Sequence, residues 1–232
     1  MSNLSIEHLI QRQIHHWNRY RELLGLAEAP EQIRPRPIVT ISRQLGSGGR
    51  VLAEALARRL DLQIHGYSLI DEIAGRHDLE RRFVEQLDER TRSEIELWVR
   101  GVLERRNFTS DQYLTSLVRI VRTLAAHGGV LFVGRGAHLI LGELCSLRLR
   151  VTASVGTRMD AIMRYENLDA AAARARVATS DEERDRFLRK LFKVEPDDPR
   201  QYDLVLNTDN LPPHELVSIA MTALEARGTF RE

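Results

Sequence analysis

Glycines and arginines gather in one short stretch of the chain, in an order that could bind phosphate. The stretch IVTISRQLGSGGR occupies residues 38–50, and its glycines are Gly46, Gly48 and Gly49. Glycines leave little side chain in a turn, so the backbone can curl and point several N–H groups inward. Such a nest at the start of a helix attracts phosphate. A tight connection between a strand and a helix would use the same residues, so both interpretations stay open.

The stretch departs from the complete phosphate-binding loop, G-x-x-x-x-G-K-[ST], in which the lysine reaches the terminal phosphates and the hydroxyl ligates magnesium. Gly48 keeps the second glycine, but Gly49 stands at the lysine position and Arg50 at the hydroxyl position. We therefore expect an anion cradle without its usual charge and without one metal ligand. Arg43 and Arg50 are the nearest cations that could replace the charge, because a guanidinium fork binds phosphate well.

The elements on either side of this stretch would position it. Residues 38–41 form an uncharged run rich in β-branched residues, which is typical of a strand buried on both faces of a parallel sheet. Apolar residues then recur at helical spacing over residues 51–60. Similar apolar runs follow at residues 62–65, 130–133, 147–152 and 204–206, with helical patterns between them. This alternation predicts one α/β domain, with helices on both faces of a parallel sheet.

Three motifs together resemble the cytidylate kinase-like family of P-loop proteins. They are TISRQLGSGGR, FVGRG at residues 132–136 and YDLVLNTDNL at residues 202–211. The family's glycine loop typically lacks the Walker lysine and ends in Gly-Gly-Arg. The resemblance covers residues 37–232 and implies a three-layer P-loop NTPase fold with a five-stranded parallel sheet. It also implies a helical insertion like the nucleoside monophosphate-binding domain at about residues 78–127, and a lid at about residues 158–195.

The resemblance further implies phosphoryl transfer from ATP with Mg²⁺ to a nucleoside monophosphate, CMP or dCMP first. The donor nucleotide and its phosphates would contact the loop and the turn after the last strand, that is Ser42, Arg43, Gln44, Gly46, Ser47, Gly48, Gly49, Arg50, Thr208 and Asp209. Arg158 and Arg184 would stabilise the migrating phosphoryl group, since this reaction depends on positioning and charge. Arg50, which would help to hold the donor phosphates, is also expected among the catalytic residues. No side chain is assigned as a magnesium ligand. A turn with a helix cap would explain Thr208 and Asp209 equally well.

Three further residues belong to the acceptor side of the expected site. Arg135 lies between two glycines at the end of a predicted strand, which places it beside the glycine loop. The resemblance implies that Arg135 reaches the acceptor phosphate. Asp71 and Asp181 are the candidates for an acceptor-side carboxylate, with Asp181 also expected among the catalytic residues of the lid. For Asp71, a carboxylate that only favours the dipole of its helix is the preferred alternative.

Two departures from the family pattern leave other functions open. The family usually has an aromatic–aspartate pair where this chain has His65 and Gly66, and a basic residue where it has Glu183. The first alternative is therefore a catalytically weak or inactive nucleotide-binding regulatory module. The second is a kinase that acts on another small phosphorylated or hydroxylated molecule.

Composition narrows the remaining possibilities. The 34 basic and 33 acidic residues nearly balance, which gives no bulk argument for binding nucleic acid or a membrane surface. Cys145 is the single cysteine, and no apolar run approaches the ~18 residues that a membrane helix needs, so we expect a cytoplasmic protein. The sequence pattern over residues 1–36 predicts an amphipathic helix followed by a proline-rich linker. This helix would pack on the domain or on a second subunit, forming a homodimer.

Overall fold

A parallel sheet of five strands forms the centre of the protein. The computed structural model describes residues 36–74, 92–93, 95–97, 112–126 and 128–229. Its strands are β1 (Ile38–Arg43), β2 (Gln63–Gly66), β3 (Val130–Val133), β4 (Leu147–Thr152) and β5 (Leu204–Asn207). They pair in the order β2-β3-β1-β4-β5, all in parallel. The predicted five-stranded parallel sheet is therefore confirmed.

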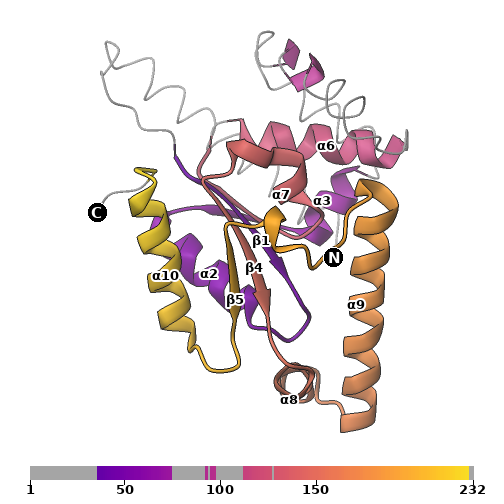
Figure 1. Ribbon diagram of the computed structural model, residues 1–232. Coiled ribbons are helices and arrows are strands. Elements are labelled where there is room, and N and C mark those ends of the chain that lie inside the picture. Colours follow the sequence, from indigo (N-terminus) through magenta and orange to yellow (C-terminus); the bar gives the residue numbers. More distant parts are fainter. Residues whose placement is uncertain (1–35, 75–91, 94, 98–111, 127, 230–232) are drawn as a thin grey trace, which may run out of the picture.

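Helices cover both faces of this sheet (Figure 1). On one face, α2 (Gly49–Leu60) and α10 (Pro213–Ala226) share a core with the strands. On the other face lie α3 (Tyr67–Ala74), α6 (Gln112–Ala125), α7 (Ala137–Leu141) and the C-terminal part of α9 (Ala170–Phe192). Short 3₁₀ turns occupy Gly142–Leu144 and Pro199–Gln201. The three-layer α/β architecture expected from the sequence is confirmed.

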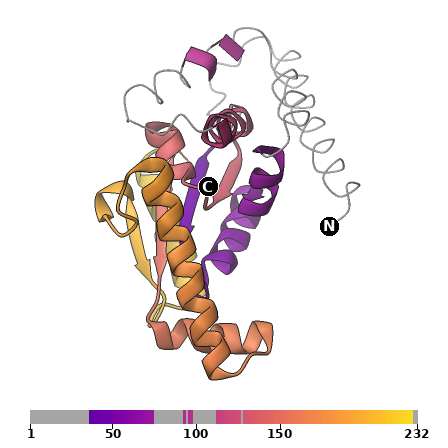
Figure 2. The ribbon, with the colours of Figure 1, turned by 90° about the vertical axis from the view of Figure 1, so that its right-hand side faces the viewer.

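The region expected to form a lid contains a helical hairpin. Helix α8 (Val155–Glu166) follows β4 and packs against α9, and the pair projects beyond the sheet at the ends of the strands (Figures 1 and 2). Leu45 of the glycine loop packs against the small apolar cluster inside this hairpin, which is formed by Ile162, Ala173 and Val177. The hairpin and the glycine loop are therefore in direct contact.

Parts of the expected organisation lie outside the described residues. These parts include the N-terminal helix and nearly all of its linker, together with most of the expected insertion at residues 78–127. Within that insertion the structure describes α6 and two short helical pieces at residues 92–93 and 95–97. The division of the chain into these parts stays a prediction. None of the described helices is long and apolar enough to cross a membrane.

Strand β4 alternates leucine and arginine, and its two arginines have different partners. Leu147, Leu149 and Val151 belong to the core shared with α2 and α10. Because side chains alternate along a strand, Arg148 and Arg150 project to the opposite face. Arg148 forms an ion pair of 2.7 Å with Asp203, whereas Arg150 donates a hydrogen bond to the Ser42 hydroxyl near the end of β1.

Asp203 joins three elements near the start of β5. Its carboxylate accepts hydrogen bonds from the side chain and backbone N–H of Arg148, and it pairs with Arg227 at the end of α10 at 3.0 Å. Burial acts to raise the pKa of Asp203, but the hydrogen bonds from Arg148 and Arg227 outweigh it and hold the pKa far below its usual range. The ionised carboxylate therefore stabilises the fold.

We expect Asp203→Asn to lower the free energy of unfolding by about 2 kcal/mol at pH 7, because charged hydrogen bonds are lost. The pKa of Asp203 is lower in the folded than in the unfolded protein, so its stabilisation is present above about pH 4 and disappears as the pH falls further. Urea denaturation at pH 7 and pH 3 measures this difference. Equal losses at both pH values would contradict the assignment.

Candidate phosphate-binding site

The loop between β1 and α2 forms a concave backbone at the start of a helix. Gly46 and Gly48 have φ angles of +79° and +75°, in the left-handed region that favours glycine. Gly48 caps α2 without any side-chain hydrogen bond, so no side chain occupies the N–H groups of the first turn. Ser47 is buried, and its hydroxyl donates to the carbonyl oxygens of Gln44 and Val151 at 2.9 Å and 3.2 Å. This arrangement can accept a phosphate group at the N-terminus of α2.

Gly46 lies against the backbone of α8. A Cβ atom at this residue would come within 2.5 Å of the carbonyl oxygen of Arg158, whereas a Cβ at Gly48 would meet nothing within 4 Å. Both residues have positive φ angles, so alanine would cost about 1 kcal/mol of backbone strain at either position. The close contact at Gly46 therefore joins the loop to the beginning of the helical hairpin.

Gly46→Ala and Gly48→Ala form a matched pair that tests this contact. We expect Gly48→Ala to lower the free energy of unfolding by about 1 kcal/mol, and Gly46→Ala by about 3 kcal/mol because Arg158 must move. Urea denaturation of the two variants gives the comparison. Equal losses would show that the hairpin yields to the new methyl group without cost.

Arg43 ends β1 and points from there toward the loop that follows β3. Its guanidinium lies 5.4 Å from the centre of the Tyr67 ring, and its Nη1 atom occupies the space that a Cβ on Gly134 would need. Among the described residues it forms no ion pair and no hydrogen bond. Burial, followed by repulsion from Arg184 and the weaker repulsion of other arginines, lowers the pKa of Arg43 to about 10. The side chain is therefore a charged, unpaired group at neutral pH.

Arg135 is held by an ion pair with Asp71 of α3. Both carboxylate oxygens of Asp71 accept hydrogen bonds from Arg135, and the Tyr113 hydroxyl donates to the same carboxylate at 2.6 Å. Burial acts to lower the pKa of Arg135, but the hydrogen bonds to Asp71 outweigh it and raise the pKa. Asp71 thus pairs with Arg135, and the interpretation in which it only favours the helix dipole is wrong.

The glycines around Arg135 serve packing. Residues 134–136 all have positive φ angles, which is unusual for the arginine. Gly134 leaves space for Arg43, and a Cβ on Gly136 would lie 2.6 Å from the Phe192 ring at the end of α9. The two glycines thus let Arg43 and the end of α9 approach Arg135 closely.

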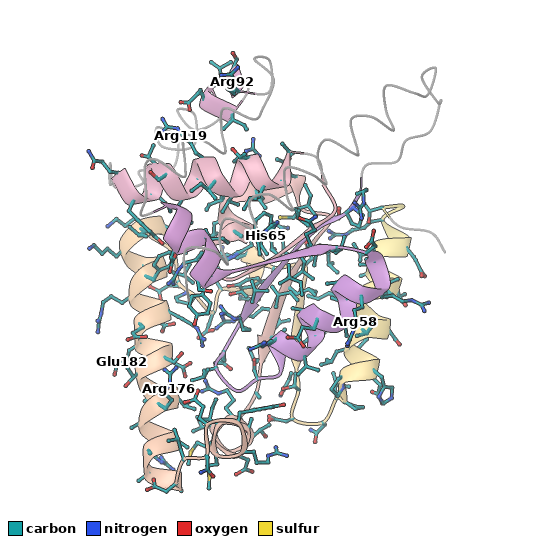
Figure 3. The ribbon with its side chains drawn as sticks, turned by 180° about the vertical axis from the view of Figure 1, so that it is seen from behind. Arg58, His65, Arg92, Arg119, Arg176 and Glu182 are labelled. Carbon is teal, nitrogen blue, oxygen red and sulfur yellow. The ribbon has the colours of Figure 1, made fainter. Side chains whose placement is uncertain are left out.

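The helical hairpin contributes Arg158, Asp181 and Arg184. Arg158 is buried in α8, and its Nη1 atom donates to both carboxylate oxygens of Asp181 in α9 at 2.8 Å and 2.9 Å. Arg184 lies one turn further along α9, and its Nη1 atom is buried without a hydrogen-bond partner. Burial is the largest cause that lowers the pKa of Arg184, and repulsion from Arg150 adds to it. Glu182 and Glu183 are exposed on the same helix (Figure 3 labels Glu182).

Three predicted site residues have other surroundings. The Arg50 side chain is 89% exposed, and its Nε atom pairs with Glu54 one turn along α2 at 2.8 Å. Thr208 donates its hydroxyl to the carbonyl oxygen of Ser47 at 3.1 Å, and Asp209 accepts from the backbone N–H of Ser154 at 2.9 Å. Thr208 thus supports the glycine loop, while Asp209 holds the residue that caps α8.

Tyr67, Arg150 and Phe187 line the site although the sequence did not single them out. Tyr67 and Phe187 lie under the Arg135 guanidinium, with ring centres 5.3 Å and 4.7 Å from its Cζ atom. Arg150 donates to the Ser42 hydroxyl at 3.2 Å, so Ser42 serves Arg150 rather than standing free in the loop. An arginine inside an apolar strand was the available signal for Arg150. The aromatic contacts depend on tertiary packing and left no local signal.

Comparisons with known proteins identify the family of this chain. The model of the cytidylate kinase-like family matches residues 38–210. The chain belongs to this family. It is 26% identical over 191 residues to a cytidylate kinase from Haloarcula marismortui, a match that covers 82% of this chain and 90% of the relative. A structure of an uncharacterized protein from Eubacterium ventriosum aligns with a TM-score of 0.61 at 18% identity, covering 82% of this chain and 99% of that one, which shows a shared fold.

Two shorter similarities were also found. The chain is 27% identical over 113 residues to a cytidylate kinase from Methanopyrus kandleri, covering 45% of this chain and 58% of the relative. It is 28% identical over 104 residues to a uronate isomerase from Corynebacterium glutamicum, covering 44% of this chain and one fifth of that protein. Membership of the cytidylate kinase-like family supports a nucleotide or small-molecule kinase.

The family implies ATP and magnesium, and the site fits these two groups differently. The glycine loop and the unpaired Arg43 fit a phosphate chain. Within the described residues, no three His, Cys, Asp or Glu side chains gather to hold a metal ion. The Ser47 hydroxyl is bonded to carbonyl oxygens, and Arg50 occupies the position where a P-loop has its metal-binding hydroxyl. These residues do not form a magnesium site, and magnesium would enter as part of the MgATP substrate.

Proposed function

We propose that the protein transfers a phosphoryl group from MgATP to a nucleoside monophosphate, with CMP or dCMP as the first candidates. The carrying observation is the position of Arg43, which lies between the glycine loop and the loop after β3 and has no carboxylate partner within the described part of the chain. A half-buried guanidinium that has no counter-ion is costly, and a bound phosphate group would compensate it. The names of the cytidylate kinase relatives motivate the choice of CMP and dCMP.

In this proposal the residues divide the work by position. The backbone of residues 46–49 and Arg43 bind the donor phosphates, while Arg135 binds the acceptor phosphate. Arg184 and Arg158 contribute charge to the migrating group from the helical hairpin, which also excludes water. Asp71 orients Arg135 through both of its carboxylate oxygens. Charge and positioning thus carry the reaction, in keeping with the chemistry of phosphoryl transfer.

A nucleotide-binding module with little or no activity is the second candidate. Asp71 and Asp181 pair with the guanidinium groups of Arg135 and Arg158, and the exposed Arg50 pairs with Glu54. If these ion pairs persist when nucleotide binds, the site would hold the nucleotide without moving its phosphate. A kinase with a different small acceptor is the third candidate, supported by Gly66 in place of the family's aspartate.

ADP formation from MgATP distinguishes these candidates. The assay offers CMP, dCMP, UMP, AMP or no acceptor to the full chain. We expect turnover that depends on CMP or dCMP, and a loss of about a hundredfold in kcat/KM for Arg135→Ala, because a charged acceptor contact disappears. Arg200→Ala is the matched control, since Arg200 is exposed and pairs with the nearby Asp198.

Each outcome of this assay favours a different candidate function. Turnover with another acceptor would replace CMP while keeping the kinase. If calorimetry detects ATP binding but no acceptor supports ADP formation, the kinase proposal fails and the module remains. An equal loss in Arg200→Ala and Arg135→Ala would remove Arg135 from the acceptor site.

A further inference from the structure

We infer that Arg150 is an additional phosphate-binding residue, which together with Arg43 and Arg184 binds a phosphate chain beside the glycine loop. This inference deepens the proposed function and rests on it for the identity of the ligand. Arg150 lies in β4, next to Ser42 of β1 in the sheet register. Arg150 therefore lies beside the end of β1, from which the loop begins, whereas Arg184 is part of α9.

The charge of Arg150 is buried and only partly compensated. The residue is 7% exposed, and its Nε atom is buried without a hydrogen-bond partner. Its Nη1 atom donates to the neutral hydroxyl of Ser42 at 3.2 Å, and its Nη2 atom to Asp197 at 2.7 Å. The Asp197 side chain is 75% exposed, so water weakens its attraction. A guanidinium held this way favours a further anion.

The neighbours of Arg150 strengthen the preference for an anion. Arg150 pairs in the sheet register with Ser42, the residue before Arg43. Repulsion from Arg150 helps to lower the pKa of both Arg43 and Arg184, as expected for neighbouring charges. The Arg150 Cζ atom lies over the Tyr202 ring, 5.9 Å from the ring centre. The Tyr202 hydroxyl contacts the Ser42 hydroxyl at 3.5 Å. The Tyr202 ring and the Ser42 hydroxyl hold Arg150 in place without neutralising its charge.

Arg150 lines a pocket that Gln44, the first residue after β1, also borders. It has a volume of about 480 Å³, and the residues that line it include Gln44 of the loop, Arg150, Tyr202 and Asp197. In this inference, a phosphate chain that extends from the loop past Gln44 meets Arg150 where Asp197 now binds. Asp197 is thus a carboxylate that competes with the ligand for the guanidinium.

Calorimetry with inorganic tripolyphosphate, without magnesium or acceptor, tests the inference on the full chain. We expect Arg150→Met to weaken binding about 30-fold, because one charged contact disappears. Arg148→Met is the matched control, since it removes an arginine from the same face of the same strand, where Asp203 neutralises it. We expect the affinity of Arg148→Met to stay within about twofold of the wild-type affinity, although its stability falls.

Asp197→Asn supplies an independent variant that keeps Arg150 in the fold. We expect this variant to bind tripolyphosphate about threefold more tightly, because the competing carboxylate is gone. No gain in Asp197→Asn would overturn the inference, as would unchanged binding in Arg150→Met or no binding by the wild-type protein. Tripolyphosphate binding requires no turnover, so the inference survives if binding depends on Arg150 while the kinase assay fails. If turnover occurs but Arg150→Met binds tripolyphosphate as tightly as the wild-type protein, the inference fails while the proposed kinase function is retained.

Discussion

Replacing Arg43 by methionine is expected to reduce kcat/KM for phosphoryl transfer by about a thousandfold, which is typical for the loss of a principal phosphate-stabilising charge. Counted back from Gly48, Arg43 stands at the first glycine of the P-loop pattern. Its half-buried guanidinium lies against Tyr67 and Gly134 and has no counter-ion among the described residues. Methionine retains most of the packing but removes the charge, so the fold should remain.

Arg50→Met is the matched control for this experiment. Arg50 occupies the hydroxyl position of the P-loop pattern, but its side chain is exposed and pairs with Glu54. We expect kcat/KM to change by less than about twofold, because an exposed i,i+4 ion pair contributes little. Steady-state kinetics with ATP varied at saturating acceptor gives both values. A large loss in Arg50→Met with a small loss in Arg43→Met would transfer the phosphate-binding role to Arg50.

The fold could be predicted from the sequence because its signals are local. The β-branched run at residues 38–41 and the apolar stripe at residues 51–60 identify a strand and a helix without reference to the rest of the chain. The glycine turn between them then fixes a strand–loop–helix unit. Because parallel strands need crossovers, the later alternation of strands and helices left few other architectures.

The site was only partly predictable, because its details depend on the direction of side chains. Arg43 and Arg50 are both close to the glycines in sequence. Arg50 lies in the first turn of α2, and its side chain points into solvent. Arg43 lies at the end of β1, and its side chain points toward Gly134 in the loop after β3. Likewise, the pairing of Asp71 with Arg135 joins residues that are 64 positions apart. Such contacts arise from the sheet order.

Arg150 illustrates what the sequence could not supply. Its pattern, an arginine alternating with leucines, is shared by Arg148, and the strand alone does not distinguish the two. Arg148 meets the carboxylate of Asp203, whereas Arg150 meets the hydroxyl of Ser42 and an exposed aspartate. The difference follows from which neighbours β1 and β5 bring to each end of β4.

The ion pair between Arg158 and Asp181 should separate stability from activity. Arg158 is 3% exposed, so we expect Asp181→Ala to leave its guanidinium buried without a carboxylate and to lower the free energy of unfolding by about 3 kcal/mol. Arg158→Met should cost less stability, because the Asp181 side chain is 31% exposed and water can solvate it. If Arg158 also contributes charge to the migrating phosphoryl group, Arg158→Met should reduce kcat by about a hundredfold.

A double variant, Arg158→Met with Asp181→Ala, completes the test. Removing both charges should recover much of the stability lost in Asp181→Ala, since no buried charge remains without its partner. It should not recover kcat, because the cation is still missing from the hairpin. Urea denaturation and steady-state kinetics on the two single variants and the double variant give the comparison. A double variant that regains both stability and turnover would show that the pair only holds α8 against α9.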